Sequence, residues 1–351
     1  MARKPPYGDY HEGMAHRAVY SRAACIYKRV PKGVLFPKAE EDLAWALNRA
    51  TELKAGVTMR AGGSGLAGQT VGEGIIADVS RFMNRVLSVD VRKNEAAVEP
   101  GVVLSDLNRR LKVLGLSFAP DPSSAAFCCI GGMLANNSKG PRSVKYGTTA
   151  RHVNWIRMLL HDGSEVRLEK GGRKPGEYGH PALRLAAELI ASNHEAILAK
   201  WPRSRTNTSG YNLKDCLRED GNVDLIPLFV GSEGTLGIFL EAGLNLAPIP
   251  PSRSLAMAEF ASLEAAADAV TALLPFGPSA CELMSETFLD IIRKGEGEFP
   301  LGLDERSKAI LLLEADGADP DEAEAGLEAI LRLMKREGES PSPSPCLSHG
   351  N

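Results

Sequence analysis

Two spacings of apolar residues alternate along this chain, and each predicts a different kind of element. Residues 40–56 repeat leucine and alanine at helical spacing behind three acidic residues, which predicts a helix that ends at Gly56. Residues 153–169 hold two β-rich runs around Asp162 and Gly163, a pair that suits the tight turn of a hairpin. The other elements expected in the first 250 residues are helices over 102–115 and 182–201, strands over 57–60 and 75–79, and a second hairpin over 85–101.

A proline cluster at 248–251 separates this region from a second one in which strands and helices alternate. The expected strands there are 255–260, 279–284 and 308–317, and the expected helices are 262–277, 286–294 and 321–339. This order predicts a sheet with its helices on one face, and an α+β class for the whole chain. Residues 340–351 repeat Ser-Pro without any apolar period, so we expect a disordered tail.

Composition excludes several classes of protein. The 351 residues carry a formal net charge of −3, without the basic surplus of proteins that bind nucleic acid. No apolar run reaches the roughly 18 residues that a transmembrane helix needs. The six cysteines show no C-x-x-C spacing, and the histidines form no H-x-H or H-E-x-x-H motif. We therefore expect reduced thiols, no metal site and a cytoplasmic protein.

The segment RAGGSGLAGQT, residues 60–70, matches the G-x-G-x-x-G fingerprint of dinucleotide-binding proteins through Gly63, Gly65 and Gly68. That fingerprint has meaning only where a strand precedes it, a helix follows it, and an acidic residue stands about 20 residues further on. Here a second strand is expected in place of the helix, and Asp90 falls within a hairpin. The Rossmann interpretation therefore fails, and the glycines need another explanation.

Glycines and small polar residues also end β-runs at 123–140 and 231–237. Glycine lets the backbone approach a ligand closely, and successive N–H groups can cradle the oxygens of a pyrophosphate. The segment 123–140 runs through Gly131 into a helix start, whose dipole would favour an anion. Three such loops predict a long ligand such as a dinucleotide, and tight turns between strands are an equally weighted alternative.

Five motifs in this order resemble the FAD-linked oxidases of the vanillyl-alcohol oxidase and p-cresol methylhydroxylase (PCMH) superfamily, in the branch of D-lactate and D-2-hydroxyglutarate dehydrogenases. The motifs are IYKRVPKGVLFPKAEEDL, RAGGSGLAGQT, VEPGVVLSDLNRRL, DPSSAAFCCIGGMLANNSKGPRSVKYGTT and LFVGSEGTLGI. The resemblance implies a PCMH-type FAD-binding fold of two subdomains followed by an α+β cap that binds substrate. The implied limits are an N-terminal extension at 1–30, the FAD-binding domain at 31–250, an incomplete cap at 251–339 and the tail at 340–351.

The resemblance also implies which residues hold the cofactor. Ser64 stands where members that bind FAD covalently often carry histidine, which implies non-covalent FAD. Cys128 and Cys129 stand where Ser or Thr is common, and an inert buried thiol is the simpler expectation for both. The implied FAD-binding residues are Arg60, Gly62, Gly63, Ser64, Gly65, Leu66, Gln69, Thr70, Pro100, Gly101, Pro122, Ser123, Ser124, Cys129, Ile130, Gly131, Gly132, Asn136, Ser138, Gly140, Tyr146, Gly147, Glu233, Gly234, Thr235, Gly237 and Ile238.

The implied reaction is oxidation of a D-2-hydroxy acid, either D-lactate or D-2-hydroxyglutarate. The substrate gives a hydride to flavin N5 while a base takes the hydroxyl proton. The candidates for a part in this chemistry are His152, Arg151 and Glu282, and a supporting or solvated role is the simpler interpretation of each. The electrons would pass on to a quinone, a cytochrome or a flavoprotein.

The end of the chain departs from this branch. The H-x-H…H cluster that binds a divalent metal and the substrate in the family is missing, and so is the cysteine-rich iron–sulfur domain of longer relatives. We therefore expect a C-terminally truncated chain. One alternative is a catalytically incomplete FAD-binding fragment of a larger FAD and iron–sulfur dehydrogenase, and another is a glycolate oxidase-like or alkyl-glycerone-phosphate synthase-like flavoenzyme. Attachment to the inner face of a membrane through a partner is the alternative to a purely cytoplasmic location.

Overall fold

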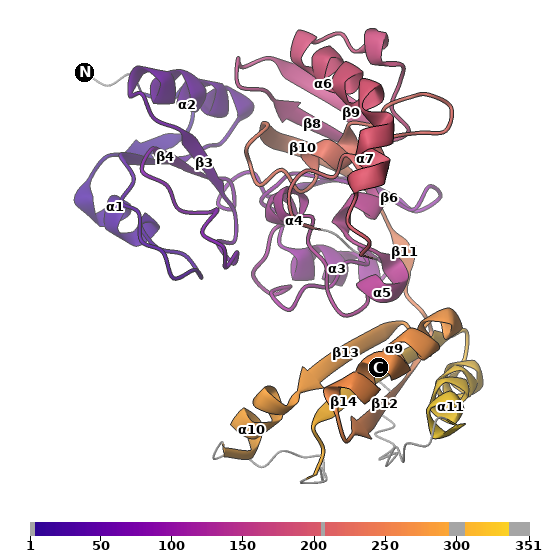
Figure 1. The fold of residues 1–351 in the computed structure, drawn as a ribbon. Coiled ribbons are helices and arrows are strands. Elements are labelled where there is room, and N and C mark those ends of the chain that lie inside the picture. The colour runs from indigo at the N-terminus through magenta and orange to yellow at the C-terminus, as the bar shows by residue number, and fades with distance from the viewer. Residues whose placement is uncertain (1–3, 205–207, 295–305, 337–351) are drawn as a thin grey trace. The chain divides into compact units, whose positions relative to one another are not determined.

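The computed structural model describes residues 4–204, 208–294 and 306–336, and the chain divides into two compact units (Figure 1). Unit 1 consists of Met1–Ser138 and Thr148–Ala247, and unit 2 of Lys139–Gly147 and Pro248–Asn351. The α+β class is confirmed. The division after Ala247 lies close to the predicted domain limit, whereas the grouping of Lys139–Gly147 with unit 2 was not predicted. The predicted tail at 340–351 lies outside the described residues.

The first part of unit 1 is a four-stranded sheet covered by a helix. Its elements are β1 (Asp9–His11), α1 (Met14–Tyr20), β2 (Gly33–Phe36), α2 (Glu40–Glu52), β3 (Val57–Arg60) and β4 (Ile75–Asp78), with strand order β1-β2-β4-β3. Strands β2 and β3 both run parallel to β4. The buried Leu43 and Ala46 of α2 pack with Leu35 and Ile75 of the sheet. No helix lies between the parallel strands β3 and β4, which confirms that the glycine loop is not part of a Rossmann βαβ unit.

The second part of unit 1 is built on a five-stranded antiparallel sheet. Its strands are β5 (Val86–Asp90), β6 (Glu95–Val98), β8 (Val153–Leu159), β9 (Glu165–Glu169) and β10 (Ile238–Asn245), in the order β5-β6-β10-β8-β9. Its helices are α3 (Leu104–Lys112), α4 (Ile130–Asn136), α6 (Pro181–Ser192), α7 (His194–Lys200) and α8 (Ile226–Phe229). The short strand β7 (Leu116–Ser117) pairs with β11 (Ala247–Pro248). Both predicted hairpins are confirmed, as β5–β6 and β8–β9.

Two predicted helix ends are wrong. Helix α2 ends at Glu52, and Lys54 with φ +48° makes the left-handed turn that we expected at Gly56. The N–H of Ala55 donates to the carbonyl of Ala50 at 2.9 Å, the bond that closes a Schellman motif around Lys54. The single helix expected over 182–201 is interrupted at Asn193. The Asn193 side chain donates to a carbonyl of α6 at 2.8 Å, a local bond that competes with helix continuation.

Unit 2 is a three-stranded antiparallel sheet with helices on both faces. Its elements are α5 (Ser143–Tyr146), β12 (Ser252–Phe260), α9 (Leu263–Leu273), β13 (Ala280–Ser285), α10 (Glu286–Lys294), β14 (Ala309–Gly317) and α11 (Pro320–Arg336), with β14 in the centre of the sheet. Helices α9 and α11 share one core with Ala258 and Leu311. Helix α10 packs Leu289 against Met257 and Ile310, which point to the other face because strand side chains alternate. The prediction of helices on one face is therefore correct for α9 and α11 and wrong for α10.

Candidate cofactor site

The three glycine-rich loops of unit 1 meet at one cavity of about 220 Å³. We call them loop A (residues 61–70), loop B (123–129, ahead of α4) and loop C (231–237). Strand β3, which leads into loop A, and helix α4 complete the wall. Pockets that bury a drug-sized ligand measure roughly 300–1,000 Å³. The enclosed volume of this cavity therefore takes up only part of a ligand as long as a dinucleotide.

Most residues predicted to bind FAD line this cavity. They are Arg60, Gly62, Gly63, Ser64, Gly65, Gln69, Thr70, Pro100, Ser124, Cys129, Gly131, Gly132, Asn136, Ser138, Glu233, Gly234 and Gly237. Others of unit 1 lie outside the lining: Leu66, Gly101, Pro122, Ser123, Ile130, Thr235 and Ile238. Ile130 and Ile238 are instead buried in hydrophobic clusters of unit 1. The assignment of individual contacts to FAD stays a prediction.

Loop A presents backbone N–H groups that the rest of the protein leaves available. Within the described part of the chain, none of the amides of residues 63–67 donates to a backbone carbonyl. Gly63 has φ +63°, a conformation that strains other residues. A Cβ on Gly62 would lie 2.0 Å from the carbonyl oxygen of Phe127 in loop B. The glycines thus allow two loops to pack closely while a row of amides stays free for an anion.

The start of α4 and parts of loops B and C use their amides within the protein. The N–H of Ile130 donates to Val102 at 2.9 Å, and the N–H of Gly131 donates to Pro100 at 2.8 Å. In loop C the N–H of Glu233 donates to a carbonyl of α4 at 2.9 Å. The amides of Ile130 and Gly131 are therefore already used within the protein, and the preference of the helix dipole for an anion stays a prediction. These segments shape the wall, and loop A adds the row of amides at residues 63–67 that donate to no backbone carbonyl among the described residues.

Two buried side-chain oxygens on the cavity wall lack a hydrogen-bond partner among the described residues: Gln69 Oε1 and Thr70 Oγ1. Gln69 Nε2 donates to Asn136 Oδ1 at 3.1 Å, which fixes the amide group in place. A buried polar atom without a partner is costly unless a ligand supplies one. A threonine hydroxyl can donate to a phosphate oxygen, and a glutamine carbonyl can accept from a ribose or base. Together with the free amides of loop A, these atoms fit a dinucleotide such as FAD.

Cys128 and Cys129 line the cavity as buried, protonated thiols. Burial raises the pKa of Cys129 to about 12, with a smaller contribution from Cys128 beside it. Burial likewise raises the pKa of the Cys128 thiol. Because the thiolate is the reactive form, neither side chain acts as a base or nucleophile at neutral pH.

We expect Cys129 and the buried Cys216 to resist alkylation in the folded protein. Burial also raises the pKa of Cys216 to about 12, and such a thiol is ionised to about one part in ten thousand at pH 8, against about one part in four for an ordinary cysteine. Iodoacetamide labelling followed by peptide mass mapping should give rates at least about a thousandfold lower than in guanidinium. Comparable rates in the two states would contradict the burial of these thiols.

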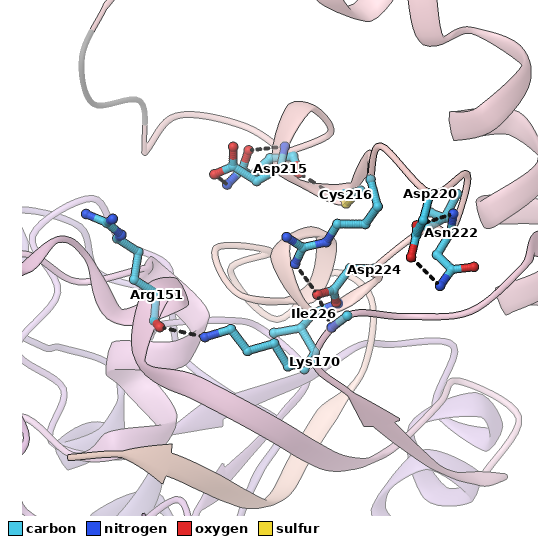
Figure 2. Close-up of polar contacts among 12 residues, drawn as sticks. Arg151, Lys170, Asp215, Cys216, Asp220, Asn222, Asp224 and Ile226 are labelled. Carbon is cyan, nitrogen blue, oxygen red and sulfur yellow. Dashed lines mark hydrogen bonds and ion pairs between the residues drawn. The ribbon is translucent and has the colours of Figure 1, made fainter. Parts of the chain in front are cut away.

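The three candidates for chemistry do not line this cavity. His152 is buried with its ring edge-on to Phe118, at 5.9 Å between ring centres. Arg151 lines a separate cavity of about 610 Å³ in unit 1, and its carbonyl accepts a bond from Lys170 Nζ at 3.2 Å (Figure 2). Glu282 is exposed on β13 in unit 2. Their catalytic roles stay predictions, without support from the geometry of the cavity.

The remaining predicted FAD-binding residues, Gly140, Tyr146 and Gly147, lie in the segment that belongs to unit 2. Arg142 of this segment makes two hydrogen bonds to the buried Glu314, from Nε at 2.8 Å and from Nη2 at 2.6 Å. Tyr146 donates to Asp316 at 2.5 Å, and Lys145 pairs with the same carboxylate. These bonds hold the segment against β14.

The cavity also contains residues that the sequence analysis did not assign to FAD binding. They are Val57, Thr58, Met59, Ala61, Val79, Cys128, Met133, Ala135 and Phe239. Val57, Thr58, Met59, Val79 and Phe239 belong to none of the five motifs, whereas Ala61, Cys128, Met133 and Ala135 lie inside them. Their position in the sequence could have indicated the residues of β3. This strand runs directly into loop A, and residues at the end of such a strand lie next to any ligand that the loop binds.

The described residues hold neither a grouped metal site nor a membrane-spanning helix. Among them, no three His, Cys, Asp or Glu side chains are grouped so that they could hold a metal ion. No helix in the described ranges has both the length and the apolar character needed to cross a membrane.

Two protein families match this chain. Residues 31–169 match the family described as FAD binding domain, and residues 249–341 match the C-terminal domain of FAD linked oxidases. A D-2-hydroxyglutarate dehydrogenase of Pseudomonas putida is 30% identical over 347 residues, which cover 94% of this chain and 34% of that protein. The glycolate oxidase subunit GlcD of Bacillus subtilis is 30% identical over 93% of this chain and 60% of its own length. The chain thus spans about a third of the first relative.

A mitochondrial D-lactate dehydrogenase (cytochrome) of Arabidopsis thaliana is 29% identical over 77% of this chain and 40% of its own length. Among solved structures, an alkyldihydroxyacetonephosphate synthase superposes with a TM-score of 0.68 over 96% of this chain and 60% of that one. At 17% sequence identity, this likeness shows a shared fold and nothing more.

Proposed function

Because this chain belongs to the FAD-linked oxidases and uses FAD as its cofactor, we propose that it oxidises a D-2-hydroxy acid. Relatives named D-2-hydroxyglutarate dehydrogenase and D-lactate dehydrogenase support this substrate class. The observation that carries the proposal is the cavity of unit 1, where free amides on loop A face the same space as two unpaired side-chain oxygens. Bound FAD supplies an acceptor for the substrate hydride, a chemistry that no amino-acid side chain offers.

The part of unit 1 in this reaction is to bind and orient the cofactor. The amides of loop A stabilise negative charge on the pyrophosphate, and apolar wall residues such as Met133 and Phe239 exclude water from beside it. The described lining contains no histidine, and its two thiols stay protonated. Apart from the carboxylate of Glu233, the base that takes the proton of the substrate hydroxyl therefore comes from outside this lining.

The proposal also places the chain in the cytoplasm and gives it a second electron acceptor. The five cysteines in the described residues are all free thiols, as expected in the reducing cytoplasm. A flavin that has taken up two electrons must pass them on before the next turnover. We propose a quinone, a cytochrome or another flavoprotein as the acceptor, and a small 2-hydroxy acid as the substrate.

Anaerobic titration of the purified, FAD-loaded protein tests the proposal. We expect D-lactate or D-2-hydroxyglutarate to bleach the visible absorbance of oxidised flavin, while the L-enantiomers leave it unchanged. Later addition of a quinone analogue, cytochrome c or oxygen should restore the colour only with the acceptor that the protein uses.

The same titration separates the alternative function. A chain that spans about a third of its dehydrogenase relative can bind FAD without turnover, as part of a larger enzyme. Bound flavin that no 2-hydroxy acid bleaches would establish this alternative. Failure to bind any flavin would overturn both.

A further inference from the structure

Residues 20–27 contact loop A although they precede the part of the chain that matches the FAD binding domain, which begins at residue 31. The N–H of Ala24 donates to the carbonyl of Gly63 at 3.1 Å. The ring of Tyr27 fills the space beside Gly68, where a Cβ would lie 2.6 Å from Tyr27 Cδ2. The N-terminal segment therefore contacts loop A at Gly63 and Gly68, in addition to the contact of loop B at Gly62.

The same segment fixes the side chain of Arg60, the last residue of β3. Arg60 Nη1 donates to the carbonyl of Arg22 at 2.7 Å, and its guanidinium lies over the ring of Tyr20 at 4.9 Å from the ring centre. The hydroxyl of Tyr20 in turn donates to Asp78 Oδ2 at 2.6 Å. Asp78 is the residue of β4 that pairs with Arg60 in the parallel sheet. The ring of Tyr20 is thus anchored to the strand next to that of the arginine it supports.

The other edge of the Arg60 guanidinium faces loop A. Nε and Nη2 each lie 3.0 Å from the position that a Cβ of Gly63 would occupy. The described lining of the cavity contains no other lysine or arginine, and its only other residue with a full charge is Glu233. A guanidinium that is already held in place binds a phosphate group with little loss of side-chain freedom.

We propose that Tyr20 and Arg22 position Arg60 as the cation that recognises the pyrophosphate of FAD, which makes the N-terminal segment part of the cofactor site. The inference rests on the assignment of FAD to this cavity. Tyr20 and Arg22 are positioning residues, because they act through the guanidinium of Arg60. A phosphate-specific role has a clear consequence: loss of the charge weakens binding of FAD and leaves binding of riboflavin, which has no phosphate, unchanged.

Dissociation constants of the apoprotein for FAD and riboflavin, measured by flavin fluorescence, test the role of the charge. For Arg60→Gln we expect FAD to bind about tenfold to a hundredfold more weakly, the range of one charge-assisted hydrogen bond, and riboflavin to change less than about twofold. Arg60→Lys keeps the charge and should recover part of the loss. The dependence of FAD affinity on salt concentration should become shallower in Arg60→Gln.

Variants of Tyr20 test the positioning. Tyr20→Phe keeps the ring under the guanidinium and should bind FAD nearly as well as the unmodified chain. Tyr20→Leu removes the stacked ring, and we expect about threefold to tenfold weaker binding of FAD alone. Arg17→Gln is the matched control, because Arg17 Nε also donates to a backbone carbonyl of the N-terminal region, that of Pro31 at 2.7 Å, without lining the cavity.

The outcomes separate this inference from the proposed function. If the unmodified chain binds no FAD, the proposed function fails. If it binds FAD and Arg60→Gln changes neither the affinity nor the salt dependence, the inference alone fails. Equal weakening of FAD and riboflavin with an unchanged salt dependence would also overturn it, since that pattern indicates a general distortion of the fold.

Discussion

Replacement of Gly62 by alanine is expected to weaken FAD binding at least about a hundredfold, or about 2.7 kcal/mol. The added Cβ would lie 2.0 Å from the carbonyl oxygen of Phe127, much closer than two such atoms can approach. That carbonyl has little freedom to move, because the N–H groups of Phe127 and Cys128 both donate to Ser124 at 2.8 Å. Loop A must therefore shift away from loop B, and its row of amides leaves the position that suits a pyrophosphate.

Equilibrium titration of the apoprotein with FAD measures this loss, and circular dichroism checks that the variant is folded. Gly176→Ala is a suitable control, because no atom lies within 4 Å of its added Cβ and Gly176 does not line the cavity. FAD affinity of Gly62→Ala within about threefold of the unmodified chain would show that the phosphates bind somewhere other than loop A.

The apolar pattern of the sequence was sufficient to predict most elements, because burial imposes it directly. Strand β14 is an example: Leu311 and Leu313 face one core, and Ile310 faces the other. A centre strand that is buried on both faces has the continuous apolar run that we observed in the sequence. The pattern could not show that α10 covers the face opposite to α9 and α11, because the apolar side of a helix does not indicate which face of a sheet it covers.

The glycine loops predicted the location of the site, but not which backbone amides in it are already hydrogen-bonded and which are free. A glycine in the sequence indicates close approach, yet it does not show whether the N–H beside it is already used. The amides of Ile130 and Gly131 are bonded to backbone carbonyls about 30 residues earlier in the chain, whereas those of residues 63–67 in loop A donate to no backbone carbonyl among the described residues. Only the folded structure distinguishes a loop that binds an anion from one that supports the wall.

The grouping of Lys139–Gly147 with unit 2 was the least predictable feature of the fold. The sequence motif of this segment resembles the FAD-contacting loops of the family, but its charged side chains pair with carboxylates about 170 residues further along. Nothing in the local pattern of either segment indicates that partnership. Charge pairs of this kind are specified by the tertiary fold, and they have a measurable energetic consequence.

Replacement of Arg142 by methionine is expected to destabilise unit 2 by about 3 kcal/mol at pH 7, near the lower end of the range for breaking a buried ion pair. Glu314, whose side chain is 4% exposed, would keep a buried charge after losing two hydrogen bonds. The hydroxyl of Ser279 still donates to it at 2.8 Å, and Arg253 remains 3.9 Å away, which limits the loss. Arg332→Met is the control, because Arg332 forms an exposed helix-surface pair expected to contribute less than about 0.5 kcal/mol.

The effect of Arg142→Met should decrease as the pH falls. Burial by itself would raise the pKa of Glu314, but hydrogen bonds from Arg142 and Ser279 outweigh it and lower the pKa. In the unmodified chain this carboxylate therefore contributes stability above its unfolded pKa of about 4.3 and loses it as the pH falls through the lower folded value. In the variant, burial dominates, so the pKa rises and Glu314 takes up a proton at a higher pH, which removes the penalty of a buried charge.

Urea unfolding followed by circular dichroism at pH 7 and pH 5 should therefore give a larger difference between the two proteins at pH 7. Hydrogen exchange locates the effect: peptides from β14 should lose protection in the variant, and peptides from β8 in unit 1 should keep it. All three tryptophans (Trp45, Trp155 and Trp201) lie in unit 1, so their fluorescence gives a second measure of that unit. Equal destabilisation at both pH values would mean that the methionine acts through lost packing, and that Glu314 does not depend on Arg142 for its charge.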